Sequence, residues 1–111
     1  MPTRRGDVVA VAAAGNYGKP RPAVIVQSDA FPEDYASVVV CQMTSVIRDD
    51  VDFRVTVEPS TVNGLRLRSQ VMADKPIAIP RRRVGQSIGR LSISDMGRLD
   101  TALAFVMGLS G

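Results

Sequence analysis

One arginine of this 111-residue chain lies in a setting that suits phosphate chemistry. Residues 19–26 read Lys-Pro-Arg-Pro-Ala-Val-Ile-Val, so Arg21 stands between two prolines and immediately before four apolar residues. Proline fixes φ and is confined to strand starts, edges and turns, so Pro22 indicates the start of a buried strand. Pro22 also restricts the backbone of Arg21 to extended conformations, so the direction of the Arg21 side chain is limited before a ligand binds. The planar guanidinium can bind a phosphate through two hydrogen bonds. A solvated arginine at a strand end would give the same local pattern.

The remaining residue types limit the chemistry further. Histidine is absent and Cys41 is the single cysteine, which excludes imidazole acid–base catalysis, histidine triads, histidine metal sites and an internal disulfide. Cys41 ends a Val-Val-Val-Cys run and is expected to be a buried, inert thiol. Two hydroxyls, Thr44 and Ser45, follow that β-prone segment. Catalysis would therefore depend on arginine, lysine, carboxylates, hydroxyls or backbone amides.

Charge is segregated along the chain, although the net charge is only +3. Residues 29–58 carry seven acidic side chains and two arginines, whereas residues 66–90 carry seven basic side chains and one carboxylate, Asp74. A segregated basic stretch favours an acidic partner, with nucleic acid the first candidate. Alternatively, the basic residues pair with the acidic third of the chain after folding.

Several short elements would position these residues. Strands are expected at residues 6–12, 21–27, 36–43 (the central strand) and 53–58, and a short or edge strand at 77–79 between Pro76 and Pro80. Residues 13–20 have turn chemistry, with Tyr17 at the tip as a surface residue or a platform for stacking a base. Glycines bend residues 84–91. Ser92 and Asp95 have capping-box spacing for a helix over about 93–109, which Gly108 ends.

The pattern predicts an α+β fold, a small and mostly antiparallel β-barrel with a C-terminal α-helix. We expect one domain over residues 1–111, with the barrel at about 6–91 and the helix at about 93–109. No apolar run approaches the roughly 20 residues of a membrane span, and the N-terminus lacks the apolar core of a signal peptide. A cytoplasmic location is therefore expected.

The order of these features resembles the MazF/PemK (Kid) toxins of bacterial toxin–antitoxin systems. The matching features are an early Arg-Gly-Asp-Val, the hairpin segment around Arg21, a valine-rich strand ending in Thr44-Ser45, a Ser-x-Val-x-x-Asp-Lys-Pro segment at 69–76, and Gly89-Arg90-Leu91-Ser92 before the helix. The resemblance runs from Arg5 to about Leu109.

The resemblance implies an SH3-like barrel of the MazF/CcdB type that forms homodimers. Such toxins are ribosome-independent endoribonucleases, or mRNA interferases, that cut single-stranded mRNA at short sequences and inhibit growth until an antitoxin neutralises them. They cut by attack of the substrate's own 2′-hydroxyl, which leaves a 2′,3′-cyclic phosphate and a 5′-hydroxyl and needs no metal or cofactor. The antitoxin usually lays an acidic, disordered segment across the toxin's groove.

The resemblance also implies roles for individual residues. Arg21 would stabilise the charge that develops on the phosphate, Thr44 would hydrogen-bond a phosphoryl oxygen, and Asp74 would be the base. The RNA-binding residues would be Tyr17, Lys19, Ser45, Lys75, Arg81, Arg82 and Arg83. This chain departs from the family in three ways: Gln42-Met43 precede Thr44 instead of a Pro-x pair, Met72 replaces an arginine of PemK-like members, and no histidine stands in the first loop.

Two other functions remain open on the sequence. A CcdB-like inhibitor of DNA gyrase shares the fold, but such proteins use a tryptophan near the C-terminus, and this chain contains none. The second is a barrel that binds RNA without cutting it, an alternative that Met72 keeps open.

Overall fold

The computed structural model describes residues 3–12, 19–51 and 53–109. They form six strands, one turn of 3-10 helix and one α-helix. In chain order these are β1 (Asp7–Val11), β2 (Arg21–Ile25), β3 (Ser37–Thr44), β4 (Arg54–Val57), β5 (Ser69–Pro80), the 3-10 turn η2 (Arg81–Arg83), β6 (Val84–Arg90) and α1 (Ile93–Val106).

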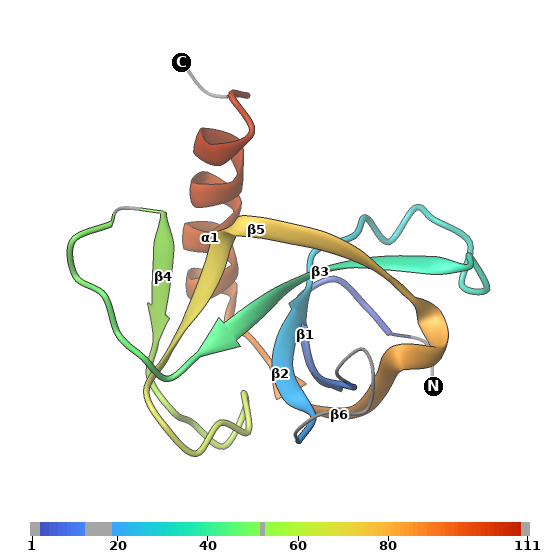
Figure 1. The fold of residues 1–111 in the computed structure, drawn as a ribbon, viewed down its shortest axis with the longest axis horizontal. Coiled ribbons are helices and arrows are strands. Elements are labelled where there is room, and N and C mark those ends of the chain that lie inside the picture. Colours follow the sequence, from blue (N-terminus) through green and yellow to red (C-terminus); the bar gives the residue numbers. More distant parts are fainter. Residues whose placement is uncertain (1–2, 13–18, 52, 110–111) are drawn as a thin grey trace.

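All six strands belong to one antiparallel sheet in the order β4-β5-β3-β2-β1-β6. Figure 1 shows β3 and β5 running side by side across the molecule, with β1, β2 and β6 curled around one end and α1 near β4 at the other. The predicted α+β class and the central position of β3 are confirmed. The sheet is curled like a barrel but is not closed, because β4 and β6 are its two edges within the described part of the chain.

The strands read as almost continuous apolar runs because the sheet is covered on both faces. On one face Val8, Val24 and Cys41 pack with residues of β4 and β5 against Leu99 and Leu103 of α1. Their neighbours in sequence project to the other face, where they form a second cluster inside the curl: Val9, Val11, Ala23, Ile25, Val38, Val40 and Ile79.

For residues 77–79 the short alternative is wrong, because these residues belong to the 12-residue strand β5, but the edge alternative is confirmed, because this half of β5 pairs with β3 alone among the described residues. Pro76 and Pro80 are tolerated there because β4 pairs only with residues 69–72, so the second half of β5 has β3 on one side and no strand on the other.

The predicted helix is confirmed as α1. Ser92 is its N-cap, and its Oγ accepts a hydrogen bond from the Asp95 N–H at 3.0 Å. After Met107 the chain turns at Gly108, whose φ of +72° lies in the left-handed region that favours glycine. No helix in the described ranges is long and apolar enough to cross a membrane.

Candidate active site

A groove of about 460 Å³ opens at one end of the sheet, where β2 begins and β3 ends. Arg21, Thr44 and Ser45 all line it, so three of the residues expected to act on RNA lie together. The rest of the lining comes from the strand ends, β6 and the β4–β5 loop (residues 58–68): Pro22, Met43, Gly64, Leu65, Arg66, Leu67, Ser69 and Ile88. Cationic, hydroxyl and apolar side chains therefore share one concave surface.

The register of the sheet explains why Arg21 and Thr44 meet. β2 and β3 pair Ala23 with Gln42 at the end of their ladder, and continuing this register by two residues along each strand would place Arg21 opposite Thr44. Residues that face each other across an antiparallel pair project to the same side of the sheet. Arg21 is exposed and forms no ion pair with any residue the structure describes. Its guanidinium is thus available to a ligand beside the Thr44 hydroxyl.

The Thr44 hydroxyl is oriented by the turn that follows β3. Its Oγ1 accepts a hydrogen bond from the Val46 N–H at 3.1 Å. A hydroxyl has one proton and two lone pairs, so this contact leaves the Thr44 O–H free to donate to an oxygen in the groove. Such a donor, fixed by its own backbone, suits a phosphoryl oxygen.

Gln70 holds the same turn and was not identified from the sequence. It pairs with Thr44 across β3 and β5 and is 2% exposed. Its Oε1 accepts from the Arg48 N–H at 3.0 Å, and its Nε2 donates to the Arg48 carbonyl at 3.0 Å and to the Thr56 Oγ1 at 3.1 Å. A buried glutamine inside a strand pattern was the available signal, because a buried amide needs partners.

Arg66 is the second groove residue that sequence reasoning missed. It belongs to the basic stretch from residue 66 to residue 90, but attention there went to the run Arg81–Arg83. Arg66 is exposed, lines the groove and has no ion pair among the described residues. Only the fold could single it out, since loops carry no periodicity that predicts where a side chain points.

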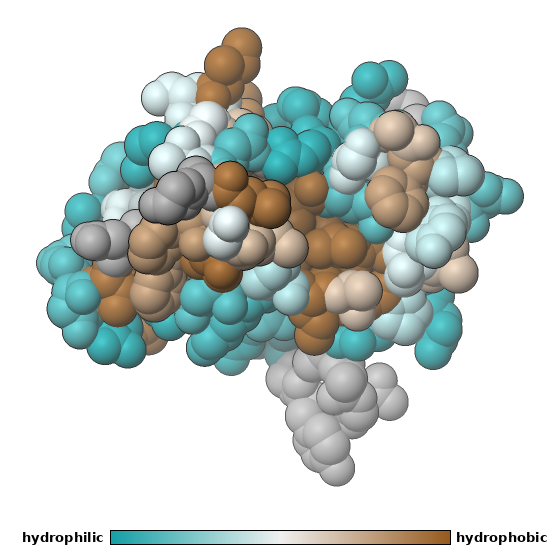
Figure 2. All heavy atoms as spheres, turned by 90° about the horizontal axis from the view of Figure 1, so that it is seen from above, coloured by the Kyte–Doolittle hydropathy of each residue, from teal (hydrophilic) through white to brown (hydrophobic). Residues whose placement is uncertain are grey.

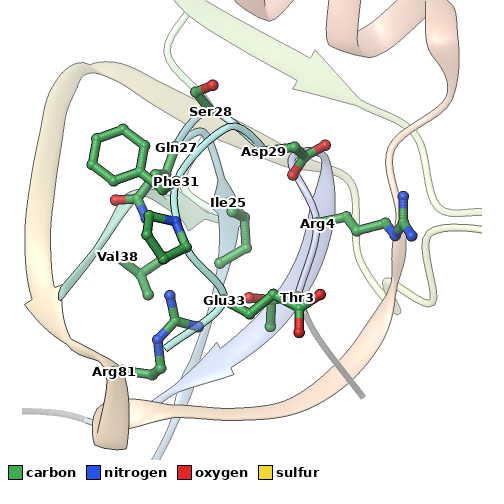
Figure 3. A pocket seen from close by; sticks show the side chains of 11 residues that line it. Thr3, Arg4, Ile25, Gln27, Ser28, Asp29, Phe31, Glu33, Val38 and Arg81 are labelled. Atoms are coloured by element: carbon green, nitrogen blue, oxygen red, sulfur yellow. The ribbon is translucent and has the colours of Figure 1, made fainter. Parts of the chain in front are cut away.

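The run Arg81–Arg83 lies away from this groove. The Nε of Arg81 donates to the Tyr35 carbonyl at 2.7 Å, and the Nε of Arg83 donates to the Ala12 carbonyl at 3.0 Å. Arg81 lines a separate, smaller hollow of about 140 Å³, and Figure 3 shows its side chain directed into that hollow near Glu33. Arg4 and Asp29 also line this hollow, so its charges are balanced. Arg82 is exposed and outside both linings.

The other predicted site residues are not part of the groove lining. Lys19 and Lys75 are exposed, and Tyr17 lies outside the described residues. Asp74 is half-buried on β5, and its Oδ1 is buried without a hydrogen-bond partner among the described residues. The structure therefore does not bring Asp74 together with Arg21 and Thr44 in one lining.

Charge pairing accounts for only part of the basic stretch. Arg68 pairs with Glu58 at 2.8 Å, and Arg90 pairs with Asp7. Arg66 and Lys75 have no ion pair among the described residues. Arg21 and Arg66, the two arginines that line the groove, are therefore not neutralised by the acidic third of the chain among the described residues.

Cys41 is a core residue, as predicted. It is fully buried between the sheet and α1, and burial, helped by the negative charge of Asp74, raises the pKa of its thiol to about 11. The neutral thiol takes no part in the groove. In the turn that follows β3, the Arg48 guanidinium holds the pKa of the Asp50 carboxyl below its usual value.

Comparisons with known proteins show the family of the chain. Residues 4–107 match the family described as PemK-like, MazF-like toxin of type II toxin–antitoxin system. The chain is 41% identical over 109 residues to the "Probable endoribonuclease MazF" of Mycolicibacterium smegmatis, covering 97% of this chain and 99% of that protein.

Solved structures show the same fold. The Mycobacterium tuberculosis toxin MazF-mt6 superposes with a TM-score of 0.80 at 26% identity, covering 95% of this chain and 99% of that one. An endoribonuclease from a mycobacterial species, solved in complex with its cognate antitoxin, gives a TM-score of 0.81 at 28% identity, with 98% of each chain covered. The chain therefore belongs to the family of PemK-like, MazF-like toxins of type II toxin–antitoxin systems.

Proposed function

We propose that this protein is a toxin endoribonuclease that cuts single-stranded mRNA in the groove between β2, β3 and the β4–β5 loop. The observation that carries the proposal is that Arg21 and Thr44 line one groove, where, among the described residues, the Arg21 guanidinium has no ion pair and the Thr44 hydroxyl proton is free. Apolar side chains beside them, such as Leu67 and Ile88, suit the faces of unpaired bases. The name of the 41% identical relative supports the same activity.

In the proposed reaction the 2′-oxygen of the substrate attacks the adjacent phosphorus, and the bond from phosphorus to the 5′-oxygen breaks. The products are a 2′,3′-cyclic phosphate and a 5′-hydroxyl; the 2′-hydroxyl proton is lost and the leaving oxygen gains one. Negative charge grows on the phosphoryl oxygens in the transition state. Arg21 stabilises this charge, and the Thr44 O–H donates to one of those oxygens and helps hold the attacking geometry.

The group that moves the proton is assigned less directly. Arg21 is a poor proton donor because the guanidinium stays protonated at any ordinary pH. Asp74 is the carboxylate that the resemblance implies as base; its Oδ1 has no hydrogen-bond partner among the described residues, but Asp74 does not line the groove. Met72, two residues before Asp74 on β5, leaves this carboxylate without the arginine that PemK-like members place there.

The toxin is further proposed to act as a homodimer in the cytoplasm, where its mRNA substrate lies. Figure 2 views the molecule from the side to which α1 points its C-terminal end and shows apolar side chains gathered across this face. A hollow of about 400 Å³ there is lined by Val26, Phe31, Leu103, Met107 and Leu109, among others. Met107 and Leu109 in this lining are 60% and 78% exposed. A second copy covering these side chains would remove them from water.

An antitoxin of acidic character is the expected inhibitor. The support is chemical: Arg21 and Arg66 present unpaired positive charge in the groove, and an acidic segment laid across it would exclude RNA. The mycobacterial relative solved with its cognate antitoxin supports such a partner for this chain.

The decisive assay is incubation of the purified protein with a long single-stranded RNA in EDTA. The proposal predicts discrete fragments that carry 5′-hydroxyl ends, and sequencing of those ends would map the recognised site. RNA that is bound but left intact would support the non-catalytic alternative instead. A gyrase supercoiling assay covers the third possibility, and inhibition there without RNA cleavage would refute the proposal.

A further inference from the structure

We propose that Arg66 forms a second phosphate-binding subsite of the groove, which holds a backbone phosphate of the RNA next to the one that is cut. The inference rests on the proposed function, because it names how the same groove grips its substrate. It assigns a positioning role to a loop residue, separate from the charge stabilisation assigned to Arg21.

The first observation is the free charge of Arg66. Its side chain is exposed and lines the groove, and no ion pair or side-chain hydrogen bond occupies it among the described residues. A guanidinium offers five N–H donors in a fixed fork, which binds a phosphate through two parallel hydrogen bonds. A donor set of this size beside the groove suits an anionic ligand.

The second observation is that the β4–β5 loop is held in place by a buried asparagine. Asn63 is 3% exposed. Its Oδ1 accepts from the N–H groups of Ser60 and Leu65, each at 3.0 Å, and its Nδ2 donates to the Glu58 carbonyl at 2.8 Å. The Asn63 side chain thus ties together backbone groups from both sides of it in the loop. Arg66 follows directly after this anchored segment.

The third observation is the contact between the loop and β6. The Arg90 N–H donates to the Val62 carbonyl at 2.9 Å. Gly64 has a φ of +69°, and a Cβ there would lie 2.2 Å from the Ile88 carbonyl oxygen. Gly89 is equally confined, since its Cβ would lie 2.3 Å from the Val62 oxygen. Two backbones that approach this closely fix the loop against the sheet. Arg66 therefore projects from a rigid base, which lowers the entropic cost of gripping a ligand.

A neighbouring arginine supplies an internal contrast. Arg68 lies two residues further along the same loop, but its Nε donates to the Glu58 Oε2 at 2.8 Å, and Arg68 is not in the groove lining. The two residues share chemistry, exposure and loop. They differ in that Arg66 is unpaired and lines the groove, whereas Arg68 is paired and does not.

The position of Arg66 on a different element from Arg21 and Thr44 favours a flanking phosphate. Continuing the β2–β3 register would place Arg21 opposite Thr44, and the two would share the reacting phosphate. Arg66 lies on the loop wall beside Leu67, which is 63% exposed, so a base can rest on the apolar side chain while its phosphate meets the guanidinium. This arrangement strengthens substrate binding equally in the ground state and the transition state.

The test compares Arg66→Ala with Arg68→Ala on a short RNA that contains the mapped cleavage site. We expect Arg66→Ala to raise KM about tenfold with kcat within about twofold of the parent, the size of one lost charge-assisted contact. Binding is measured separately with the same RNA carrying a 2′-O-methyl group at the cleaved nucleotide, which cannot form the cyclic phosphate. There the slope of log K against log salt should fall by about 0.7 for one lost single-strand phosphate contact. Arg66→Lys should recover part of the affinity.

The outcomes separate this inference from the proposed function. If the parent cuts RNA and Arg66→Ala behaves like Arg68→Ala in KM and in salt slope, the Arg66 subsite is refuted while the nuclease stands. A fall in kcat with an unchanged KM would also refute it, since Arg66 would then act on the reacting phosphate. If the parent neither cuts nor binds the RNA, the proposed function itself fails. Circular dichroism and the unfolding midpoint of both variants should match the parent, because both side chains are exposed.

Discussion

Replacing Gln70 with methionine should damage both the stability of the fold and the position of Thr44. Methionine has nearly the same volume, but it removes the three hydrogen bonds that Gln70 makes to the Arg48 backbone and to Thr56. Each such bond is worth about 1 kcal/mol, and loss of one partner in a buried site costs more. Because Arg48 is exposed, water can replace part of what its backbone loses.

These terms give an expected loss of about 2 kcal/mol in the free energy of unfolding. For a chain of this size that corresponds to a fall of roughly 8 °C in Tm. The turn after β3 would also lose its tie to β5, so the Thr44 hydroxyl would no longer be held toward the groove. We therefore expect kcat to fall about tenfold at a temperature where the variant is fully folded.

Gln27→Met is the matched control. Gln27 is 8% exposed, and its Oε1 accepts from the Val39 N–H at 3.1 Å, but it does not line the groove. It should lose about 1 kcal/mol of stability and keep the parent kcat. Thermal unfolding and single-turnover cleavage at 20 °C measure the two effects separately. A Gln70→Met variant that is destabilised yet cuts at the parent rate would refute the positioning role of the turn.

Three further predictions follow from other parts of the molecule. Gly64→Ala should lower the free energy of unfolding by about 2 kcal/mol and slow cleavage, because the added Cβ would clash with the Ile88 carbonyl. Gly97→Ala is the control: its Cβ would meet open space on α1, so the free energy of unfolding should stay the same or rise slightly. The buried Cys41 thiol should resist alkylation in the native protein at pH 8.5. Because the pKa of this thiol is about 11 in the folded protein and 9.0 in the unfolded chain, the stability that the neutral thiol contributes should be lost as the pH rises from about 9 to 11. In Cys41→Ala the free energy of unfolding should fall less over this pH range. Asp74→Asn should reduce kcat about a hundredfold, and a variant that cuts at the parent rate would remove Asp74 from the mechanism.

The features that sequence reasoning predicted well are those encoded by neighbouring residues. Pro22 indicates where β2 begins, the valine run indicates a buried β3, and Ser92 and Gly108 bracket α1. Each signal depends on the chemistry of a few adjacent residues, such as a missing N–H, a cap or a positive φ. Arg21 was singled out by its two flanking prolines, whereas the role of Thr44 was implied by the resemblance to the toxin family; the structure places both residues in one groove lining.

The features that escaped prediction depend on pairing between distant residues. The length of β5 follows from its ladder with β3, which no local pattern reveals, and the role of Gln70 follows from a turn 22 residues earlier. The sequence favoured the run that includes Arg81 over Arg66, because the number of arginines in a segment does not show which of them donates a hydrogen bond to a backbone carbonyl, as Arg81 does. Hydrogen bonds to carbonyls and the fit of a loop against a strand are set only when the whole sheet forms.

The central claim is that the groove holding Arg21 and Thr44 cuts RNA, with Arg21 stabilising the charge on the phosphate. Single-turnover cleavage of the mapped-site RNA by the parent and by Arg21→Ala, in EDTA and at equal folded concentration, tests it most directly. We predict that kcat falls 100- to 1,000-fold, roughly the loss seen when one oxyanion-stabilising donor is removed, and that Arg21→Lys recovers only part of it. An Arg21→Ala protein that cuts as fast as the parent would contradict the account.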